Sequence, residues 1–514
     1  MLLSRLASTS QALAATRSRL AKRELIAAVL ADATVEDVQV VVSYLAGGLR
    51  QRRTGVGWRS LESLPAPAEE ASLTVLEVDC AFAEMAGLSG PGSAVARNKR
   101  VAALMSRATA QEQDLLRGLI FGELRQGALE SQVQEGLAAA YGVGLALVRR
   151  AAMLLSSTPA AAELLLTGGG EALAAVGLQV GTAVQPMLAA SAPGPEEAVA
   201  KTGLPALVDY KLDGIRVQVH RDGEQVRVFT RSLDDITARV PEVVAAVTAL
   251  PYTRLVLDGE ALAVRGDGRP ETFQVSAART ASSTDVATMA EHTPLRVFFF
   301  DLLHVDGRDL LDADLTSRAE TMAEVLPPEL QVPRRLCAGL PEVSDAFAQA
   351  VRGGFEGVVV KNVSASYAAG RRDAAWVKLK PRHTFDLVVT AAEWGHGRRQ
   401  GWLSNLHLAA RDGATGQLVM LGKTFKGLTD ELLAWQTEQF LARETRRTAG
   451  TVHVEPSLVV EVACDGLQSS TRYPGGVALR FARVLRYRPD KVAADCDTLE
   501  TVRLLLPVAG DGGS

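Results

Sequence analysis

Hydrophobic residues recur at three- and four-residue spacing through the first third of the chain, for example in Glu24–Leu30, Val35–Leu49 and Gln111–Leu124. This spacing places apolar side chains on one face of a helix. We therefore expect an all-α region over residues 1–180. The segment "TGGG" at 167–170 and the Pro/Gly-rich segment at 191–197 interrupt the pattern, so we place a domain boundary near 170–185.

From Ala206 onward the hydrophobic period becomes two, which is typical of strands. Residues 206–220 and 225–231 read as two strands joined by a hairpin turn. Further strands are expected at 254–264, 295–305 and 355–361, with a helix at 317–326 among them. These elements predict a mixed α/β region over residues 184–381.

The last part of the chain consists of short strand patterns separated by glycine-rich turns, with one helical pattern at 429–444. The strand patterns lie at 386–395, 403–412, 417–425 and 457–467. A small β-barrel over 382–508 accounts for them, followed by a disordered tail at 509–514. The chain as a whole is thus predicted to be a multidomain α+β protein.

Charge and cysteine content limit the class of protein. A formal net charge of −4 gives no overall positive field, so any contact with phosphates must come from local basic faces. The four cysteines are far apart and form no CxxC pair, which supports neither a disulfide framework nor a zinc module and fits a reducing compartment. No stretch approaches the roughly 20 apolar residues that cross a bilayer, so we expect no membrane partner.

The first 23 residues carry five basic side chains and no acidic one. Such a segment resembles an organelle transit peptide, but leucines on one face equally predict an amphipathic first helix, which we favour. Arginine greatly outnumbers lysine along the chain, a bias that is common in GC-rich bacteria. We therefore expect a cytoplasmic, bacterial protein.

The candidate chemistry centres on Lys211 in the segment "YKLDGIR". A free lysine has a pKa of roughly 10.4, so a nucleophilic lysine needs cationic or desolvating surroundings. A lysine at a strand end before an Asp-Gly turn can lie at the mouth of a pocket, with Arg216 close by. The string KxDG by itself is also a common strand-turn sequence, so the rest of the chain must decide.

Six further segments follow "YKLDGIR" in a fixed order. They are "TRS" at 230–232, "LDGE" at 257–260, "RVFFFDLLHVDG" at 296–307, "FEGVVVK" at 355–361, "WVKLK" at 376–380 and "RFARVLRYRPDK" at 480–491. In order and spacing the set resembles the motifs of the nucleotidyltransferase superfamily of DNA ligases and RNA capping enzymes. The resemblance implies that Lys211 becomes adenylated.

The resemblance also implies how the nucleotide is held. Arg231 and Glu260 would bind the ribose hydroxyls, and Phe300 would stack on adenine. Asp209 would accept a hydrogen bond from the adenine amino group, although the family often has Glu there. Arg216 and Arg372 are candidates for the phosphates and for the 5′-phosphate of a nick.

Charged residues later in the chain complete the predicted site. Lys378 and Lys380 alternate along a strand pattern, which places both on one face, toward the α-phosphate. Glu356 is the best candidate ligand for Mg²⁺, which prefers carboxylate and phosphate oxygens, and Glu260 would share the metal. By resemblance, the final motif orients the departing pyrophosphate through a set of three residues: Arg488, Asp490 and Lys491.

The N-terminal part favours one branch of the superfamily. The segment 92–131 resembles the helical DNA-binding domain of larger ATP-dependent DNA ligases, and "QPMLA" at 185–189 resembles their junction into the adenylation domain. In this family the C-terminal domain is an OB-fold barrel. An NAD-dependent ligase would carry four clustered zinc-binding cysteines, which this chain lacks, so ATP is the expected cofactor.

The implied activity is the sealing of nicks in double-stranded DNA during repair, replication or recombination, by a monomer whose three domains encircle the duplex. Within the helical part, segments 44–58 and 119–131 share a helix ending in Leu-Arg-Gln, so Arg50 and Arg125 could each hold a DNA phosphate; ordinary helix capping explains the similarity equally well. Two other functions stay open at this point. One is a GTP-dependent capping enzyme, and the other is a DNA-binding scaffold without catalysis.

Overall fold

The structure is a computed structural model that describes residues 1–51, 54–124, 126–127, 130–266, 268, 270–281, 285–368, 374–396 and 399–505. Arg125, Arg372 and the predicted tail at 509–514 lie outside these residues. The first part of the chain is a helical region. Its helices are α1 (Leu3–Ala15), α2 (Arg19–Ala31), α3 (Val38–Leu45), α4 (Val75–Gly87), α5 (Ser93–Arg107), α6 (Ala110–Phe121), α7 (Glu130–Ala140), α8 (Leu145–Leu154) and α9 (Thr158–Ala174).

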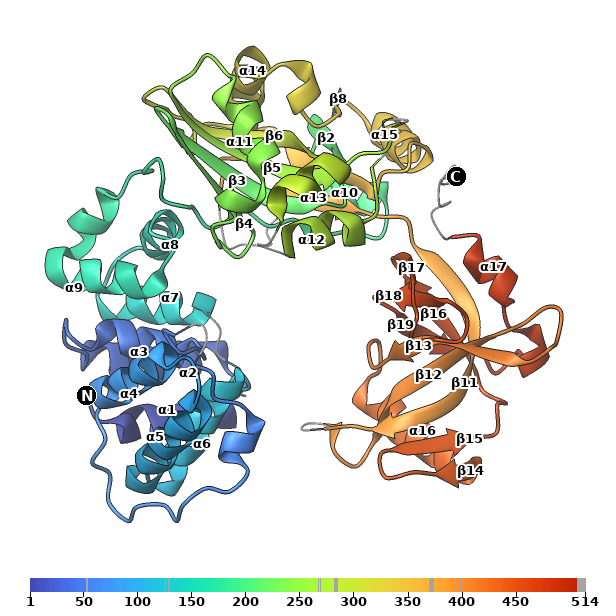
Figure 1. The fold of residues 1–514 in the computed structure, drawn as a ribbon, viewed down its shortest axis with the longest axis horizontal. Helices are drawn as coiled ribbons and strands as arrows, with labels where there is room; N and C mark the ends of the chain where they lie inside the picture. The colour runs from blue at the N-terminus through green and yellow to red at the C-terminus, as the bar shows by residue number, and fades with distance from the viewer. Residues whose placement is uncertain are drawn as a thin grey trace.

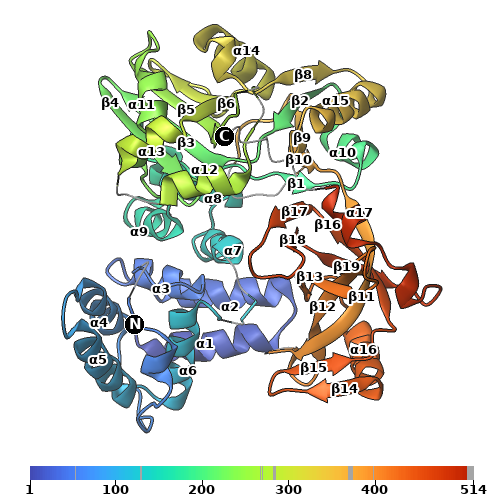
Figure 2. The ribbon, with the colours of Figure 1, turned by 45° about the vertical axis from the view of Figure 1, so that its right-hand side comes forward.

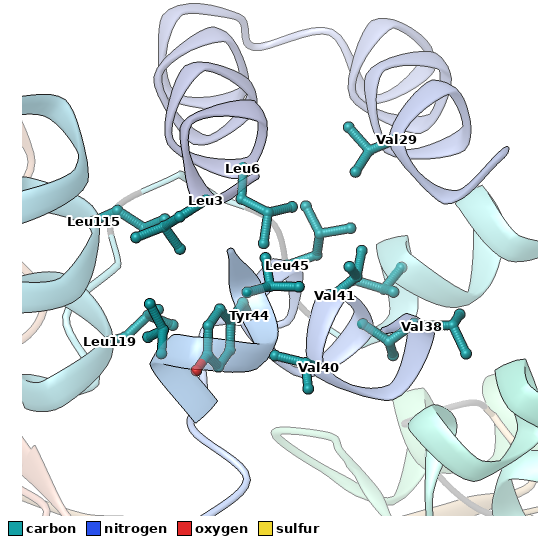
Figure 3. Close-up of a cluster of buried hydrophobic side chains, with 14 of the residues drawn as sticks. Leu3, Leu6, Val29, Val38, Val40, Val41, Tyr44, Leu45, Leu115 and Leu119 are labelled. Atoms are coloured by element: carbon teal, nitrogen blue, oxygen red, sulfur yellow. The ribbon is translucent and has the colours of Figure 1, made fainter. Parts of the chain in front are cut away.

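The apolar faces of these helices meet in one core. Figure 3 shows side chains such as Leu6, Val41, Leu45 and Leu119, which come from α1, α3 and α6 and point toward one another. Helices α4 and α6 each begin with a capping box, in which a threonine and a glutamate three residues later bond to each other's backbone amides. The all-α prediction for this part of the chain is therefore confirmed.

One local prediction in the helical region was wrong. The helix expected over Val35–Leu49 spans only Val38–Leu45, because the chain leaves the helix before Gly47, whose φ is +88°. The glycines at 168–170 interrupt the helical pattern as expected. Gly169 has a non-helical backbone conformation and forms a kink between two helical segments of α9, the second of which ends at Ala174.

The middle region is mixed α/β and contains two sheets. Its strands are β1 (Ala190–Ser191), β2 (Ala206–Lys211), β3 (Ile215–Asp222), β4 (Gln225–Thr230), β5 (Arg254–Ala263), β6 (Leu295–Val305), β7 (Arg308–Asp309), β8 (Arg334–Cys337), β9 (Gly357–Asn362) and β10 (Trp376–Leu379). Its helices are α10 (Pro195–Thr202), α11 (Pro241–Thr248), α12 (Phe273–Ala281), α13 (Val286–His292), α14 (Leu315–Val325) and α15 (Leu340–Arg352).

One sheet has the order β1-β10-β9-β2-β8, and the other has the order β4-β3-β5-β6-β7. The strand expected over 206–220 is thus two strands, because the chain crosses from one sheet to the other at residues 212–214. The β3–β4 hairpin is confirmed, with Asp222 paired to Gln225. The last residue of β2, Lys211, therefore lies where the two sheets meet.

The C-terminal region is rich in strands. Its elements are β11 (His383–Trp394), β12 (Leu403–Arg411), β13 (Leu418–Thr424), α16 (Asp430–Ala442), β14 (Glu444–Arg447), β15 (Thr451–Val454), β16 (Val459–Cys464), β17 (Gly466–Ser469), β18 (Val477–Arg480), β19 (Arg483–Tyr487) and α17 (Leu499–Arg503). The long strand β11 pairs with β12 on one side and with both β15 and β16 on the other. Among the described residues this sheet does not close, so the strand-rich region is confirmed but the closed barrel is not.

The three regions form an open, C-shaped arrangement. In Figure 1 the helical region and the C-terminal region extend from opposite ends of the middle region, and Figure 2 shows both on the same side of it. Within the described residues, no helix is both long and apolar enough to span a membrane.

Candidate functional site

Lys211 lies beside the carboxylate of Glu356. Its Nζ is 2.5 Å from Glu356 Oε2, and Lys380 Nζ contacts the other oxygen of the same carboxylate. Burial would raise the pKa of Glu356, but Lys211 and Lys380 together hold it below its usual range. The structure thus joins the predicted nucleophile, the predicted metal ligand and one predicted phosphate-binding lysine in a single cluster.

Close backbone approach explains the glycine that follows Glu356. Gly357 is paired with Lys211 across β2 and β9 and has a φ of +140°. A Cβ at Gly357 would lie 2.1 Å from the carbonyl oxygen of Leu379, the last residue of β10. A larger residue here would push β10 away and move Lys380, which follows it, away from Glu356.

Glu260 lies on β5, opposite Arg216 on β3. Its Oε1 accepts a hydrogen bond of 3.1 Å from the backbone N–H of Gly214, in the turn after Lys211. Burial raises the pKa of Glu260 to about 7, although Lys211 and Arg216 both oppose that shift. Glu260 therefore holds the turn after Lys211, the predicted nucleophile, and its pKa lies near neutral pH.

Arg216 is enclosed by protein groups. Its guanidinium forms a two-bond ion pair with Asp258, at 3.0 and 2.6 Å, and donates to the carbonyl of Met187 at 2.7 Å. The hydroxyl of Tyr367 donates to the same Asp258 carboxylate at 2.7 Å. Burial would lower the pKa of Arg216, but Asp258 outweighs it and keeps the guanidinium charged. The phosphate contact predicted for Arg216 remains a prediction.

Asp209 belongs to a buried network that spans the two sheets. Its carboxylate lies 2.6 Å from Lys361 Nζ and 3.2 Å from Arg334 Nε. Lys361 and Arg334 also donate to the carbonyl of Phe300, at 3.2 and 3.0 Å. Lys361 Nζ lies 4.9 Å from the ring centre of Phe300 and 4.2 Å from that of Trp376. The predicted base-binding residues Asp209 and Phe300 are thus held together by two cations, and their contacts with adenine remain predictions.

Lys378 and Arg231 are the remaining predicted nucleotide ligands among the described residues. Lys378 is on β10, two residues before Lys380, which itself follows the end of that strand. Arg231 is exposed in the turn after β4. Their roles remain predictions.

The C-terminal region approaches the site through the ribbon β17–β18. Arg480 Nη1 lies 3.0 Å from Asp213 Oδ2, and Asp465 Oδ2 lies 3.4 Å from Lys380 Nζ. The predicted pyrophosphate-orienting residues lie elsewhere in the same region. Arg488 binds both Asp386 and Asp490, and Lys491 binds Asp386 at 2.6 Å. The structure therefore does not bring these three residues to Lys211.

In the helical region, the two similar helix ends lie side by side. Gln126 donates a hydrogen bond of 2.6 Å to the carbonyl of Leu45, the last residue of α3. Arg50 is partly exposed and pairs with Asp79 at 3.1 Å. Arg125 lies outside the described residues, so the predicted pair of phosphate contacts remains a prediction.

Several residues around the site were not predicted from the sequence. Asp258 lies two residues before Glu260 on β5, so strand alternation alone could have placed both on one face. Lys361 closes the segment "FEGVVVK", but nothing in the sequence shows that it is buried against Asp209. The contacts of Arg334 and Arg480 join segments distant in the chain, and no local pattern predicts them.

Three family models match the chain. The ATP dependent DNA ligase domain matches residues 186–380, the ATP dependent DNA ligase C terminal region matches 399–491, and the DNA ligase N terminus matches 59–138. A probable DNA ligase of Beutenbergia cavernae is 59% identical, with 98% of this chain and 99% of that protein covered. Another, from Nocardioides sp., is 58% identical with the same coverage.

Solved structures agree at the level of the fold. The structure named Pmar-Lig_PreS3 has a TM-score of 0.64 at 20% identity and covers 94% of this chain and 99% of its own. All three parts of the chain thus match ligase models in the expected order, and relatives match it over almost its whole length. The chain belongs to the ATP-dependent DNA ligase family.

Proposed function

We propose that this protein seals nicks in duplex DNA through an AMP group carried on Lys211 Nζ, with Mg²⁺ as its divalent cation. The observation that supports this most directly is the 2.5 Å contact between Lys211 Nζ and Glu356, with Lys380 on the same carboxylate. A scaffold needs no such cluster, and the family models name DNA ligase rather than a capping enzyme. In the first step Lys211 attacks the α-phosphate of ATP and pyrophosphate leaves. In the second the AMP passes from Lys211 to the 5′-phosphate of the nick, which frees the lysine. In the third the 3′-hydroxyl attacks that 5′-phosphate and AMP leaves.

Each step moves negative charge onto phosphate oxygens, so the site needs preorganised cations. Lys380 and Lys378 would supply two of them to the α-phosphate. In the structure the ammonium of Lys211 is paired with Glu356, whereas attack requires the neutral amine. We infer that Lys211 loses a proton and leaves Glu356 when the nucleotide binds.

The carboxylate of Glu356 fits a magnesium ligand. Lys211 and Lys380 hold its pKa below the usual range, so it is charged at neutral pH, and a charged carboxylate oxygen is a preferred Mg²⁺ ligand. Bound Mg²⁺ would neutralise charge on the phosphate oxygens. Glu260 would share the ion. Within the described residues no three His, Cys, Asp or Glu side chains gather as a metal site, so ATP oxygens would complete the coordination.

For the rest of the nucleotide, we propose that Phe300 stacks on adenine and that Asp209 accepts from its amino group. Their shared contacts with Lys361 support this, because the two groups are held in a fixed relation before the nucleotide arrives. Arg231 and Glu260 would bind the ribose. Arg216 and Arg372 would bind the phosphates of ATP and, later, the 5′-phosphate of the nick.

The pyrophosphate-orienting role of Arg488, Asp490 and Lys491 requires another position of the C-terminal region. In the structure these residues pair with Asp386 and with each other, while β17–β18 faces Lys211. We propose that this region rotates between adenylation and sealing, as cap domains commonly do. The present arrangement would then belong to the sealing steps.

We further propose that the protein works as a monomer that surrounds a nicked duplex, in the cytoplasm of a bacterium. The C-shaped arrangement in Figure 1 supports this, because the helical and C-terminal regions extend from opposite ends of the middle region. Arg50 and Arg125 would contact phosphates. The proposed domains are residues 1–180 for DNA binding, 184–381 for adenylation and 382–508 for the OB-fold.

The test is incubation with α-labelled ATP and Mg²⁺, followed by a denaturing gel and then by addition of nicked DNA. We expect the wild type to retain label and to discharge it with sealing, and Lys211→Ala to retain none. Lys201→Ala is the matched control, because Lys201 is an exposed lysine on α10 that binds only the carbonyl of Ser191 in the described contacts. A wild type without label would overturn the proposal, and so would a labelled Lys211→Ala protein.

A further inference from the structure

A row of polar side chains on β3 holds the chain segment that enters the middle region from the helical region. Arg216, Gln218 and His220 alternate along β3 and therefore point to the same face. Arg216 donates to the carbonyl of Met187, whereas Gln218 and His220 bind residues 181–184. The proposed chemistry uses neither Gln218 nor His220.

Gln218 and His220 form one hydrogen-bond network with this segment and with each other. The N–H of Gly181 donates to His220 Nδ1 at 3.0 Å, and the N–H of Val184 donates to Gln218 Oε1 at 2.7 Å. Gln218 Nε2 donates in return to the carbonyl of Val184 at 3.1 Å. Because Nδ1 of His220 accepts, its proton lies on Nε2, which donates to Gln218 Oε1 at 2.9 Å. Burial also lowers the pKa of His220 to about 3, so the ring stays neutral.

The helical region is attached to the same segment from the other side. The N–H of Gln185 donates to the carbonyl of Met153 at 3.1 Å, and Ser156 Oγ donates to the carbonyl of Ala183. Arg150 binds the carbonyl of Val176 at 2.7 Å and Asp312 of the middle region at 2.8 Å. In both Figure 1 and Figure 2, α8 lies at the end of the helical region that faces the middle region.

Apolar packing continues across this junction. Met153 and Leu154 of α8 share a buried cluster with Val184 and Met187, and the same cluster includes Trp376 beside the nucleotide site. A buried cluster with backbone groups paired on both sides leaves a connecting segment little freedom to bend. The junction is therefore built as a fixed joint rather than as a free linker.

We propose that Gln218 and His220 are positioning residues for the DNA-dependent steps, because they fix the helical region relative to the strand that follows Lys211. The inference rests on the proposed function, in which the helical region grips the duplex. If the helical region is already fixed before DNA binds, binding does not have to restrict its orientation. The entropic cost of binding is then smaller and the affinity for DNA is higher. The attack of Lys211 on ATP involves no DNA and should not depend on this joint.

The test uses His220→Leu and Gln218→Leu, assayed separately for self-adenylation and for sealing. We expect self-adenylation to stay within about twofold of wild type, while the KM for nicked DNA rises at least about tenfold. His220→Asn keeps a side-chain oxygen near the position of Nδ1 and should restore most of the affinity for nicked DNA. A cavity of about 220 Å³ adjoins His220, so water can reach the freed N–H of Gly181 without general unfolding.

His304→Leu is the matched control. His304 is also buried and lies on β6 of the same sheet, but its ring binds Asp309 and the N–H of Gly307 rather than the junction. Its replacement should leave the KM for nicked DNA unchanged. An equal loss in both reactions for His220→Leu and Gln218→Leu, or no loss in either, would overturn the inference.

Hydrogen exchange on the wild type tests the joint without any substitution. We expect the amides of Gly181 and Val184 to exchange as slowly without DNA as those of β3, and rapid exchange would contradict a fixed joint. If the wild type itself fails to adenylate or to seal, the proposed function fails instead. If the wild type is active and the variants show no split between the two reactions, only this inference fails.

Discussion

Arg480 of the C-terminal region lies 3.0 Å from Asp213, two residues after Lys211. Together with the contact between Lys380 and Asp465, this ion pair keeps β17–β18 against the site and leaves Arg488 and Lys491 at Asp386. Under the rotation of the C-terminal region that we propose, this arrangement belongs to the sealing steps, and self-adenylation uses the face that carries Arg488 and Lys491.

We therefore predict that Arg480→Ala speeds self-adenylation and slows sealing. Both side chains of the ion pair are partly exposed, and such a pair contributes up to about 1 kcal/mol, which corresponds to a population shift of up to about fivefold. Single-turnover rates of the two reactions measure the shift. A parallel decrease in both rates would show that Arg480 does not select between arrangements.

Glu356→Gln should abolish most of the self-adenylation. The substitution removes the candidate metal ligand and the carboxylate that Lys211 and Lys380 share, so we expect a loss of at least about a hundredfold at saturating Mg²⁺. Label transfer from ATP measures it. Glu393→Gln is the control, because Glu393 also pairs with a lysine, Lys423, but lies on β11. Near-normal labelling of Glu356→Gln would refute the assigned role.

Glu260 should make stability depend on pH. Its pKa is raised from 4.5 to about 7, so between these values the folded state binds more protons than the unfolded state. The stabilisation is full below about pH 4.5 and is lost as the pH rises through about 7. The free energy of unfolding in urea should be measured for wild type and for Glu260→Gln. The wild-type value minus the Glu260→Gln value should fall from about pH 5 to about pH 8. A constant difference would contradict the shift.

The ion pair between Asp301 and Arg318 should control the stability of the middle region. Its atoms lie 2.8 Å apart and both side chains are fully buried. Asp301→Ala would leave Arg318 buried without its partner carboxylate, at a cost of about 3–5 kcal/mol in the free energy of unfolding. Asp345→Ala, which breaks an exposed pair with Arg335, should cost less than about 1 kcal/mol. Similar denaturation midpoints for the two variants would contradict the predicted larger loss of stability in Asp301→Ala.

The helical region, the strand-rich regions and the order of the motifs could be predicted from the amino-acid sequence. Periodicity reports which face of an element is buried, so it predicts helices and strands locally. The roles proposed for Lys211 and Glu356 came instead from the resemblance of seven ordered segments to the motifs of the family. A local error occurred where the chain leaves a helix before Gly47.

Which of these residues come into contact depends on the tertiary structure. Asp209 lies two residues from the nucleophile, but its buried partners Lys361 and Arg334 come from strands more than 100 residues away in the chain. The position of Arg480 at Asp213, and of Arg488 away from it, depends on how the C-terminal region docks. Contacts between distant segments depend on packing and desolvation across the whole fold, and a local pattern of residues carries no record of them.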